Sequence, residues 1–154
     1  MKLMIGNLWD YTDKADVLIF TGNSFIKRNG ELVMGRGMAL EVKKRYPFVP
    51  KLIGELIRSY PNPRKYGLAI LENLKLPFKI GSFQVKYHFR DPANMELIRY
   101  STSLLREYAE KNQHLTVFLN FPGIGYGRLK RLEGEIKRII SELPDNVYIW
   151  KLPE

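Results

Sequence analysis

The sequence predicts an α/β fold, in which helices cover both faces of one sheet. Strand-like segments alternate with helix-like segments from residue 35 onward, which is the pattern of such a sandwich. Segment 16–20 is an almost purely apolar run, as expected of a strand buried on both faces. The 154 residues, with 45% hydrophobic content, are enough for a sizeable core. We therefore expect a single domain over residues 1–154.

Each element is predicted from local pattern. Strands are expected at the apolar or alternating segments 2–5, 16–20, 68–72, 80–89, 116–120 and 147–150. Helices are expected where apolar residues recur at steps of three and four, at 35–45, 51–59, 91–112 and 129–143. Asp91-Pro92 marks a helix start, as an N-cap acid followed by proline. Asn29-Gly30 predicts a hairpin or tight turn within 25–34, and loops are expected at 61–67 and 121–127.

Composition narrows the classes of function. The chain has no cysteine, which excludes disulfides and thiolate metal sites, and its two histidines are too few for a convincing zinc site. No apolar run reaches the ~18 residues of a membrane span, and the N-terminus lacks a signal pattern, so we expect a cytoplasmic protein that does not bind membranes. The net charge of +9 favours polyanionic partners such as nucleic acid, although a lysine-rich surface without a partner has the same charge.

The stretch FQVKYHFR, residues 83–90, alternates strictly between apolar and polar residues. As a strand it would place Lys86 and His88 on the same side, about 6.5 to 7 Å apart. An interior strand of a sandwich has no wet face. This polar row therefore belongs either on an edge strand or at the carboxyl end of a strand, where ligands bind in open α/β sheets.

Three segments place glycine or asparagine directly after a predicted strand. LNFPGIGYGRL (119–129) leads through three glycines into a helix, and the segment 21–47 does the same with Gly22-Asn23 and then VMGRGMAL. Such glycines let the backbone approach a ligand, and a helix start offers free N–H groups to an anion. In IGNLWD (5–10), Asn7 either pairs with a base edge or shapes the turn. Turns without a ligand produce the same patterns.

GNLWDYTDKADVLIFTGNS, VMGRGMALEVKKRYP and NFPGIGYGRL, in this order and spacing, resemble the three signature segments of the macro domain family. They match best the subgroup that contains the DarG antitoxin and the terminal ADP-ribose protein glycohydrolase. FQVKYHFRDP resembles the segment that carries the catalytic lysine of DarG. The similarity extends over about residues 4–150. It implies a three-layer α/β/α sandwich with a mixed, mostly parallel six-stranded sheet and ADP-ribose across the strand ends.

The resemblance also implies roles for single residues. Asn7 would lie near the adenine, Asn23 would contact the distal ribose, and Lys86 would face the anomeric carbon. The expected catalytic residues are Lys86 and His88. The expected ligand-binding residues are Asn7, Leu8, Gly22, Asn23, Gly35, Arg36, Gly37, Met38, Pro122, Gly123, Ile124, Gly125, Tyr126 and Gly127.

The chemistry that the resemblance implies centres on the amine of Lys86. Desolvation and a nearby cation, Arg36 or Arg90, would lower the pKa of Lys86 and free the amine to form a Schiff base with the ring-opened ribose. His88 would orient the lysine or shuttle a proton; the alternative is that both side chains contact only water.

Two features depart from the family pattern. Segment 24–34 is longer than its counterpart, so the hairpin would cover the cleft or change access to it. The protein-directed glycohydrolase pairs its lysine with an aspartate after the second glycine loop, whereas this chain has no acid there before Glu133. That difference favours the DarG-like mechanism.

The expected function is therefore a mono-ADP-ribosyl hydrolase that uses a catalytic lysine and removes ADP-ribose from DNA bases. Two alternatives stay open: a reader that binds ADP-ribose without turnover, and a phosphatase acting on ADP-ribose 1″-phosphate. The expected partners are ADP-ribose or an ADP-ribosylated macromolecule, together with nucleic acid. We expect a monomer without cofactor or metal.

Overall fold

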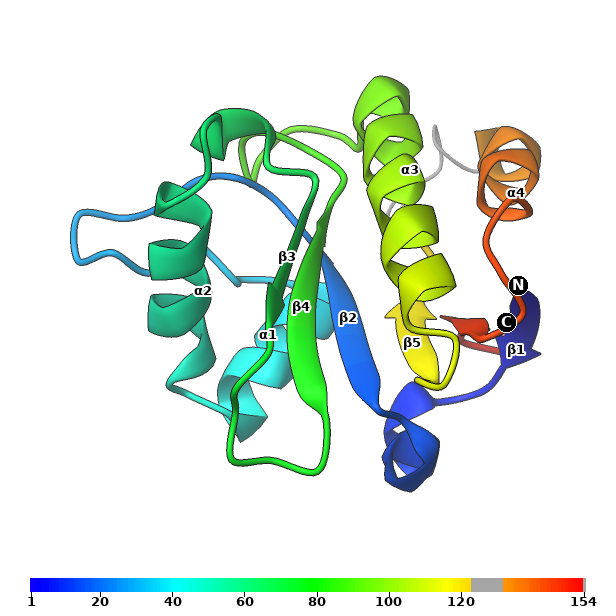
Figure 1. Ribbon diagram of the computed structural model, residues 1–154. Helices are drawn as coiled ribbons and strands as arrows, with labels where there is room; N and C mark the ends of the chain where they lie inside the picture. Colours follow the sequence, from blue (N-terminus) through cyan, green and yellow to red (C-terminus); the bar gives the residue numbers. More distant parts are fainter. Residues whose placement is uncertain (123–131, 154) are drawn as a thin grey trace.

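The computed structural model describes residues 1–122 and 132–153 and places helices on both faces of one sheet (Figure 1). The sheet has six strands in the order β1-β6-β5-β2-β4-β3. They are β1 (Lys2–Ile5), β2 (Val17–Gly22), β3 (Leu68–Leu71), β4 (Lys79–Gln84), β5 (Val117–Asn120) and β6 (Val147–Lys151). β3 runs antiparallel to β4, and the other neighbouring pairs are parallel. The predicted α/β fold with a mixed, mostly parallel sheet is confirmed.

Alternate residues of β2 point to opposite faces, and each face is covered by a pair of helices. Leu18 and Phe20 share a core with α1 (Gly37–Arg45) and α2 (Val49–Arg58). Val17 and Ile19 share the other core with α3 (Met95–Lys111) and α4 (Glu133–Ile140). All four side chains are 0% exposed, which confirms that this strand is buried on both faces. Figure 1 shows the two helix pairs on opposite sides of the sheet.

The helix ends differ from the expected ones for local reasons. α2 begins at Val49 rather than at residue 51, because Pro50 lies in its first turn, where an N–H group is not needed. The helix expected over 129–143 ends at Ile140, and residues 129–131 lie outside the described part of the chain. Two 3-10 helices, η1 (Leu8–Lys14) and η2 (Pro63–Lys65), lie in connections. None of the helices in the described ranges is both long and apolar enough to cross a bilayer.

The strand expected over 80–89 is shorter than the alternating pattern suggests. β4 ends at Gln84, so the prediction for residues 85–89 is wrong. β2, its neighbour, ends at Gly22, whose carbonyl oxygen accepts a hydrogen bond from Val85 N at 2.9 Å. Beyond Val85 the chain leaves the sheet and forms a loop that leads to α3.

α3 begins later than expected, so the helix start predicted at Asp91 is wrong. Asp91 instead closes a turn with His88, donating its N–H to the carbonyl oxygen at 3.0 Å and accepting from the N–H at 3.2 Å. Asn94 is the actual N-cap, because its side chain accepts from Leu97 N at 3.1 Å.

The turn expected at Asn29-Gly30 is confirmed. Lys27 N donates to Glu31 O at 2.8 Å, and Gly30 has a φ of +90°, a conformation that favours glycine. A single antiparallel bridge, between Ile26 and Leu32, joins the two sides. We refer to segment 25–34 as the hairpin.

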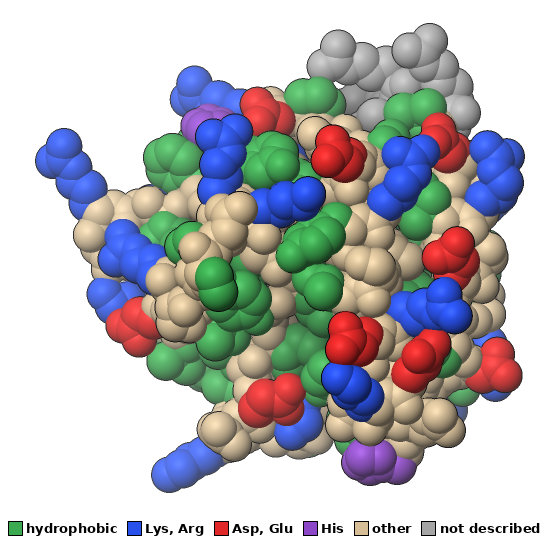
Figure 2. Space-filling view, turned by 45° about the horizontal axis from the view of Figure 1, so that its top comes forward, with side chains coloured by type: hydrophobic (Ala, Val, Ile, Leu, Met, Phe, Trp, Pro, Cys, Tyr) green, Lys and Arg blue, Asp and Glu red, His purple; other side chains and the backbone are tan. Residues whose placement is uncertain are grey.

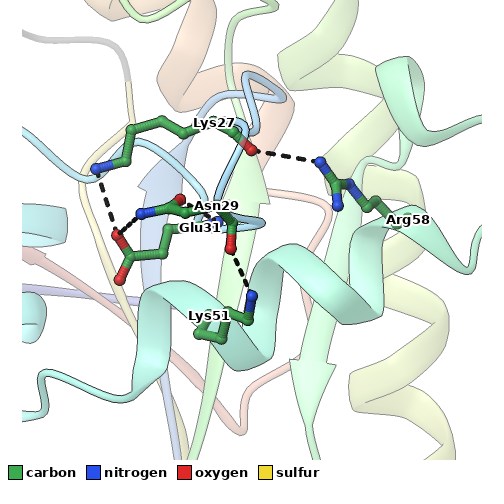
Figure 3. Close-up of polar contacts among 5 residues, drawn as sticks. All are labelled: Lys27, Asn29, Glu31, Lys51 and Arg58. Carbon is green, nitrogen blue, oxygen red and sulfur yellow. Dashed lines mark hydrogen bonds and ion pairs between the residues drawn. The ribbon is translucent and has the colours of Figure 1, made fainter.

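The hairpin is fixed against α2 (Figure 3). Lys51 and Arg58 of α2 donate to the carbonyl oxygens of Asn29 and Lys27. A Cβ atom on Gly54 would overlap the carbonyl oxygen of Gly30, so glycine at this position lets the helix touch the turn. The longer segment noted in the sequence is therefore an ordered part of the fold.

Candidate functional site

The segments singled out in the sequence meet at the carboxyl edge of the sheet. Asn7 follows β1, Asn23 follows β2, and Lys86 lies just beyond β4, all of which are parallel strands. Ser24 donates its N–H and its hydroxyl to Tyr87 O at 3.0 and 3.1 Å. The chain after β2 therefore runs beside the chain after β4, and Asn23 and Lys86 belong to the same edge.

β2 and β5 separate toward this edge. Their register pairs Val17–Ile19 with residues 117–119, and beyond it the side chain of Asn120 spans the gap. The amide oxygen of Asn120 accepts from Thr21 N at 3.0 Å, and its nitrogen donates to Thr21 Oγ1 at 3.0 Å. Ligands of open α/β sheets bind where strands diverge at their carboxyl ends. Asn120 is not among the residues expected from the sequence to bind the ligand, although a polar residue at the end of an apolar strand could have indicated it.

Lys86 is half-buried in the loop between β4 and α3. Its Nζ donates to the carbonyl oxygen of Phe89 at 2.9 Å. Desolvation by burial, more than any other cause, lowers the pKa of Lys86 below its ordinary value; the charge of Arg36 lowers it further, and Asp91 partly opposes both. A lowered pKa increases the fraction of free amine, which is the nucleophilic form.

His88 does not stand beside Lys86 on a strand, so the geometry expected for this pair is wrong. Its Nδ1 accepts from Arg90 N at 3.1 Å, which places the proton of the neutral ring on Nε2. Its ring stacks on Phe89 and meets Phe25 edge-to-face. These contacts help to shape the loop that carries Lys86, and a catalytic role of His88 stays a prediction.

Gly35, Arg36 and Gly37 lead into α1 and are exposed. Gly37 has a φ of +55°, and no described atom lies within 4 Å of the position that a Cβ would take on either glycine. Among the described residues no side chain caps this helix start, and its first turn holds no acid. An uncapped helix start next to a cation is attractive to an anion. Met38 is half-buried and packs on the core of α1 and α2.

Asn23 is 5% exposed and shapes the start of the hairpin. Its amide donates to Val33 O at 3.0 Å and accepts from Phe25 N at 2.8 Å. One amide hydrogen and one lone pair remain for a ligand. Gly22 is buried before it, and a Cβ there would overlap the hydroxyl of Ser82.

Asn7 and Leu8 lie at the start of η1. Asn7 accepts a hydrogen bond from Trp9 N at 3.1 Å and caps the 3-10 helix, so it does shape the turn. Its amide nitrogen is free of that bond and can still meet a base edge. Leu8 is 4% exposed and packs in the core, which leaves its backbone as the part that can face a ligand.

The glycine-rich segment after β5 is only partly described. Pro122 is buried two residues beyond the end of β5, whereas Gly123, Ile124, Gly125, Tyr126 and Gly127 lie outside the described residues. Figure 2 turns this edge of the molecule toward the reader and shows Lys and Arg side chains spread over the face, with Asp and Glu among them.

Two buried residues with polar side chains, Gln84 and Tyr66, were not predicted as site residues but hydrogen-bond the backbone of segments at this edge. The side chain of Gln84 accepts from Gly67 N at 2.9 Å and donates to Arg64 O at 2.8 Å and Lys86 O at 3.3 Å. Tyr66 donates its hydroxyl to Asn23 O at 2.8 Å, and burial raises the pKa of Tyr66, so it stays a donor. A polar residue within an apolar strand, as Gln84 is, is the signal that could have found this network.

A groove of about 490 Å³ lies beside β3 rather than at this edge. It is lined mainly by Tyr60, Tyr66, Leu68, Tyr100, Leu104 and Tyr108. Tyr66 is the residue that this groove shares with the network under Asn23.

No family model and no curated protein matches the chain. Solved structures do match it. The macrodomain of Thermus aquaticus DarG superposes with a TM-score of 0.72 at 25% identity, covering 99% of this chain and 97% of that chain. The macrodomain of Mycobacterium tuberculosis DarG superposes with a TM-score of 0.68 at 23% identity, covering 99% and 98%. The chain has the macrodomain fold.

A further match of this macrodomain is Thermosipho africanus DarTG in complex with ADP-ribose. The TM-score is 0.76 at 18% identity, with 99% of this chain covered but 42% of that chain. The macrodomain therefore spans less than half of that DarTG chain. At 18 and 23% identity, these matches show the fold alone. Together with DarG of Thermus, they confirm the resemblance that the sequence segments indicated.

Proposed function

We propose that this macrodomain, as a single domain over residues 1–154, binds ADP-ribose and acts as a mono-ADP-ribosyl hydrolase. The observation that carries the proposal is the setting of Lys86, an amine with a lowered pKa, half-buried at the edge where β2 and β5 separate. ADP-ribose as the ligand is supported by the DarTG complex, a structure of the same fold that holds this molecule.

The start of α1 suits the diphosphate of this ligand. Gly35 and Gly37 leave open space for close approach of the backbone, and the uncapped N–H groups of the first turn form the positive end of the helix dipole. Arg36 adds a full positive charge at the same place. Because Arg36 also lowers the pKa of Lys86, the two side chains are electrically coupled, and the distal ribose would lie between them.

The proposed reaction uses the free amine of Lys86 as a nucleophile. The amine forms a bond to the anomeric carbon while the bond from that carbon to the acceptor breaks, and the acceptor leaves with the electron pair and takes up a proton. One proton of the nitrogen goes to the leaving acceptor and the other to the ring oxygen as the ribose ring opens, which gives a Schiff base. Water then adds to this carbon, the bond to nitrogen breaks, and ADP-ribose and the lysine are released.

We further propose that the acceptor is a DNA base and that the protein works in the cytoplasm. The net charge of +9 favours a polyanionic substrate. The resemblance of the sequence segments to DarG supports a DarG-like role over one directed at protein side chains, and the DarG macrodomain of Thermus aquaticus, at 25% identity, agrees with it.

Calorimetry with ADP-ribose, followed by turnover of thymidine-modified DNA, tests this function. We expect Lys86→Ala to keep the ADP-ribose affinity within about threefold and to lower turnover by roughly a thousandfold. Lys75→Ala is the matched control, because Lys75 is exposed between β3 and β4 at the other end of the sheet. Its affinity and turnover should equal those of the wild type. Binding without turnover in the wild type would make the protein a reader, and no binding at millimolar ADP-ribose would refute both functions.

A further inference from the structure

Three aromatic rings form a contiguous cluster next to Lys86. Phe25 of the hairpin meets His88 and Phe89 edge-to-face, with ring centroids 5.0 and 5.2 Å apart. His88 and Phe89 stack on each other at 4.2 Å. Phe25 nevertheless keeps 40% of its surface exposed. We refer to these three rings as the aromatic cluster.

The backbone of the hairpin is held without the ring of Phe25. The backbone of Phe25 makes two hydrogen bonds that any residue except proline could make, from its N–H to Asn23 Oδ1 at 2.8 Å and from Val33 N to its carbonyl oxygen at 3.0 Å. The hairpin is also fixed independently against α2. The exposed part of the Phe25 ring is therefore available for a contact outside the molecule.

Two arginine side chains lie over aromatic rings of the loop that carries Lys86. The guanidinium of Arg90 lies 5.6 Å from the centroid of Phe89, and that of Arg64 lies 4.6 Å from the centroid of Tyr87. Sites for single-stranded nucleic acid combine these two ingredients, since bases stack on aromatic rings and cations follow the phosphates.

The aromatic cluster lies close to the amine of Lys86. Lys86 Nζ is hydrogen-bonded to the carbonyl oxygen of Phe89, one of the three residues of the cluster, at 2.9 Å. Ser24, the neighbour of Phe25, is bonded to Tyr87, the neighbour of Lys86. These contacts connect the loop of Lys86 with the residues that carry the rings of Phe25 and Phe89.

We propose that the aromatic cluster is a stacking site for a nucleobase of single-stranded nucleic acid, with Phe25 as its exposed ring. The inference rests on the proposed function, since it assigns the acceptor side of the same site. Arg90 and Arg64 then contact the phosphates, and the hairpin becomes a substrate-binding element rather than a lid.

Binding of an unmodified, single-stranded oligothymidylate, measured by fluorescence anisotropy, tests the proposal without ADP-ribose. We expect Phe25→Ala to weaken this binding roughly tenfold and Phe25→Leu, which keeps apolar bulk but no plane, to weaken it similarly. Phe48→Ala is the matched control, since Phe48 is 46% exposed at the start of α2, and should leave the affinity unchanged. Arg90→Gln should lower the salt slope by about one, and Lys75→Gln should not.

The outcomes for the cluster and for the proposed function are separable. Calorimetry with ADP-ribose should give the wild-type affinity for Phe25→Ala and Phe25→Leu, which also shows that both variants are folded. Equal oligonucleotide binding by the wild type and Phe25→Leu would overturn the stacking site and leave the hydrolase intact. If Phe25→Ala lost as much turnover on ADP-ribosylated peptide as on ADP-ribosylated DNA, the stacking site would also be overturned. Absence of ADP-ribose binding in the wild type would refute the proposed function instead.

Discussion

Ser24 donates both its backbone N–H and its hydroxyl to one acceptor, the carbonyl oxygen of Tyr87, at 3.0 and 3.1 Å. These two residues are 63 positions apart in the sequence. Asn23 precedes Ser24, and Lys86 precedes Tyr87. This pair of hydrogen bonds to one oxygen therefore sets the spacing between the two sides of the candidate site.

Removing the hydroxyl in Ser24→Ala should loosen this spacing. The backbone bond remains, so we expect the free energy of unfolding to fall by only about 1 kcal/mol. Turnover should fall roughly fivefold, since a 1 kcal/mol change in positioning has that effect on a rate. Ser103→Ala in α3 removes a local hydroxyl bond to Tyr100 and serves as the control. Equal turnover by the two variants would show that the Ser24 hydroxyl does not position Lys86.

The pH dependence of turnover should follow the charges around Lys86. The free amine is the reactive form, so the rate should rise with pH until Lys86 is deprotonated. Burial and Arg36 lower its pKa, whereas Asp91 raises it. Arg36→Gln should therefore move the rising limb to higher pH, and Asp91→Asn should move it to lower pH. Superimposable profiles of turnover against pH for the three proteins would contradict a role of the Lys86 amine as nucleophile.

The arrangement of helices on both faces of a sheet could be predicted from the sequence, because hydrophobic spacing determines which segments can be buried. The apolar run that forms β2 indicated a strand buried on both faces, and the structure agrees. The alternation of residues 83–90 was misleading for a physical reason. A strand continues only as far as its neighbour does, and β2 ends at Gly22. The pattern of residues 83–90 therefore could not reveal where β2, the neighbouring strand, ends.

The site was predictable only where local chemistry marks it. The glycines around Arg36 and the lysine after β4 stand out in the sequence, and the structure brings both to one edge. Asn120 and Thr21 are 99 positions apart, so their bonds depend on strand order, which local pattern does not reveal. The start of α3 was predicted at the wrong residue because Asp91 and Asn94 are both suitable N-cap residues. Asp91 instead bonds to His88 in a turn, and Asn94 caps the helix.

Gly35 and Gly37 should respond differently to alanine. Gly37 has a φ of +55°, so Gly37→Ala should lower the free energy of unfolding by about 1–2 kcal/mol. Gly35→Ala meets no described atom within 4 Å and should change stability by less than about 0.5 kcal/mol. If ADP-ribose occupies this space, Gly35→Ala should still weaken its binding roughly tenfold, the scale of a steric penalty of about 1–3 kcal/mol. Unchanged affinity in calorimetry would move the ligand away from the start of α1.

The contact between α2 and the hairpin should depend on Gly54. A Cβ atom there would overlap the carbonyl oxygen of Gly30, and backbone yields less readily than a side chain. Gly54→Ala should therefore push the hairpin away from α2 and lower the free energy of unfolding by about 1–3 kcal/mol. Because Phe25 belongs to the hairpin, oligothymidylate affinity should fall with it.

Gly134→Ala is the control for this change, since Gly134 is exposed in α4 with no described atom within 4 Å of a Cβ. It should raise stability by up to about 1 kcal/mol, as alanine favours a helix over glycine. Thermal unfolding and anisotropy of the two variants separate the effects. If Gly54→Ala lost stability but kept the wild-type oligonucleotide affinity, the hairpin would carry no part of the binding surface.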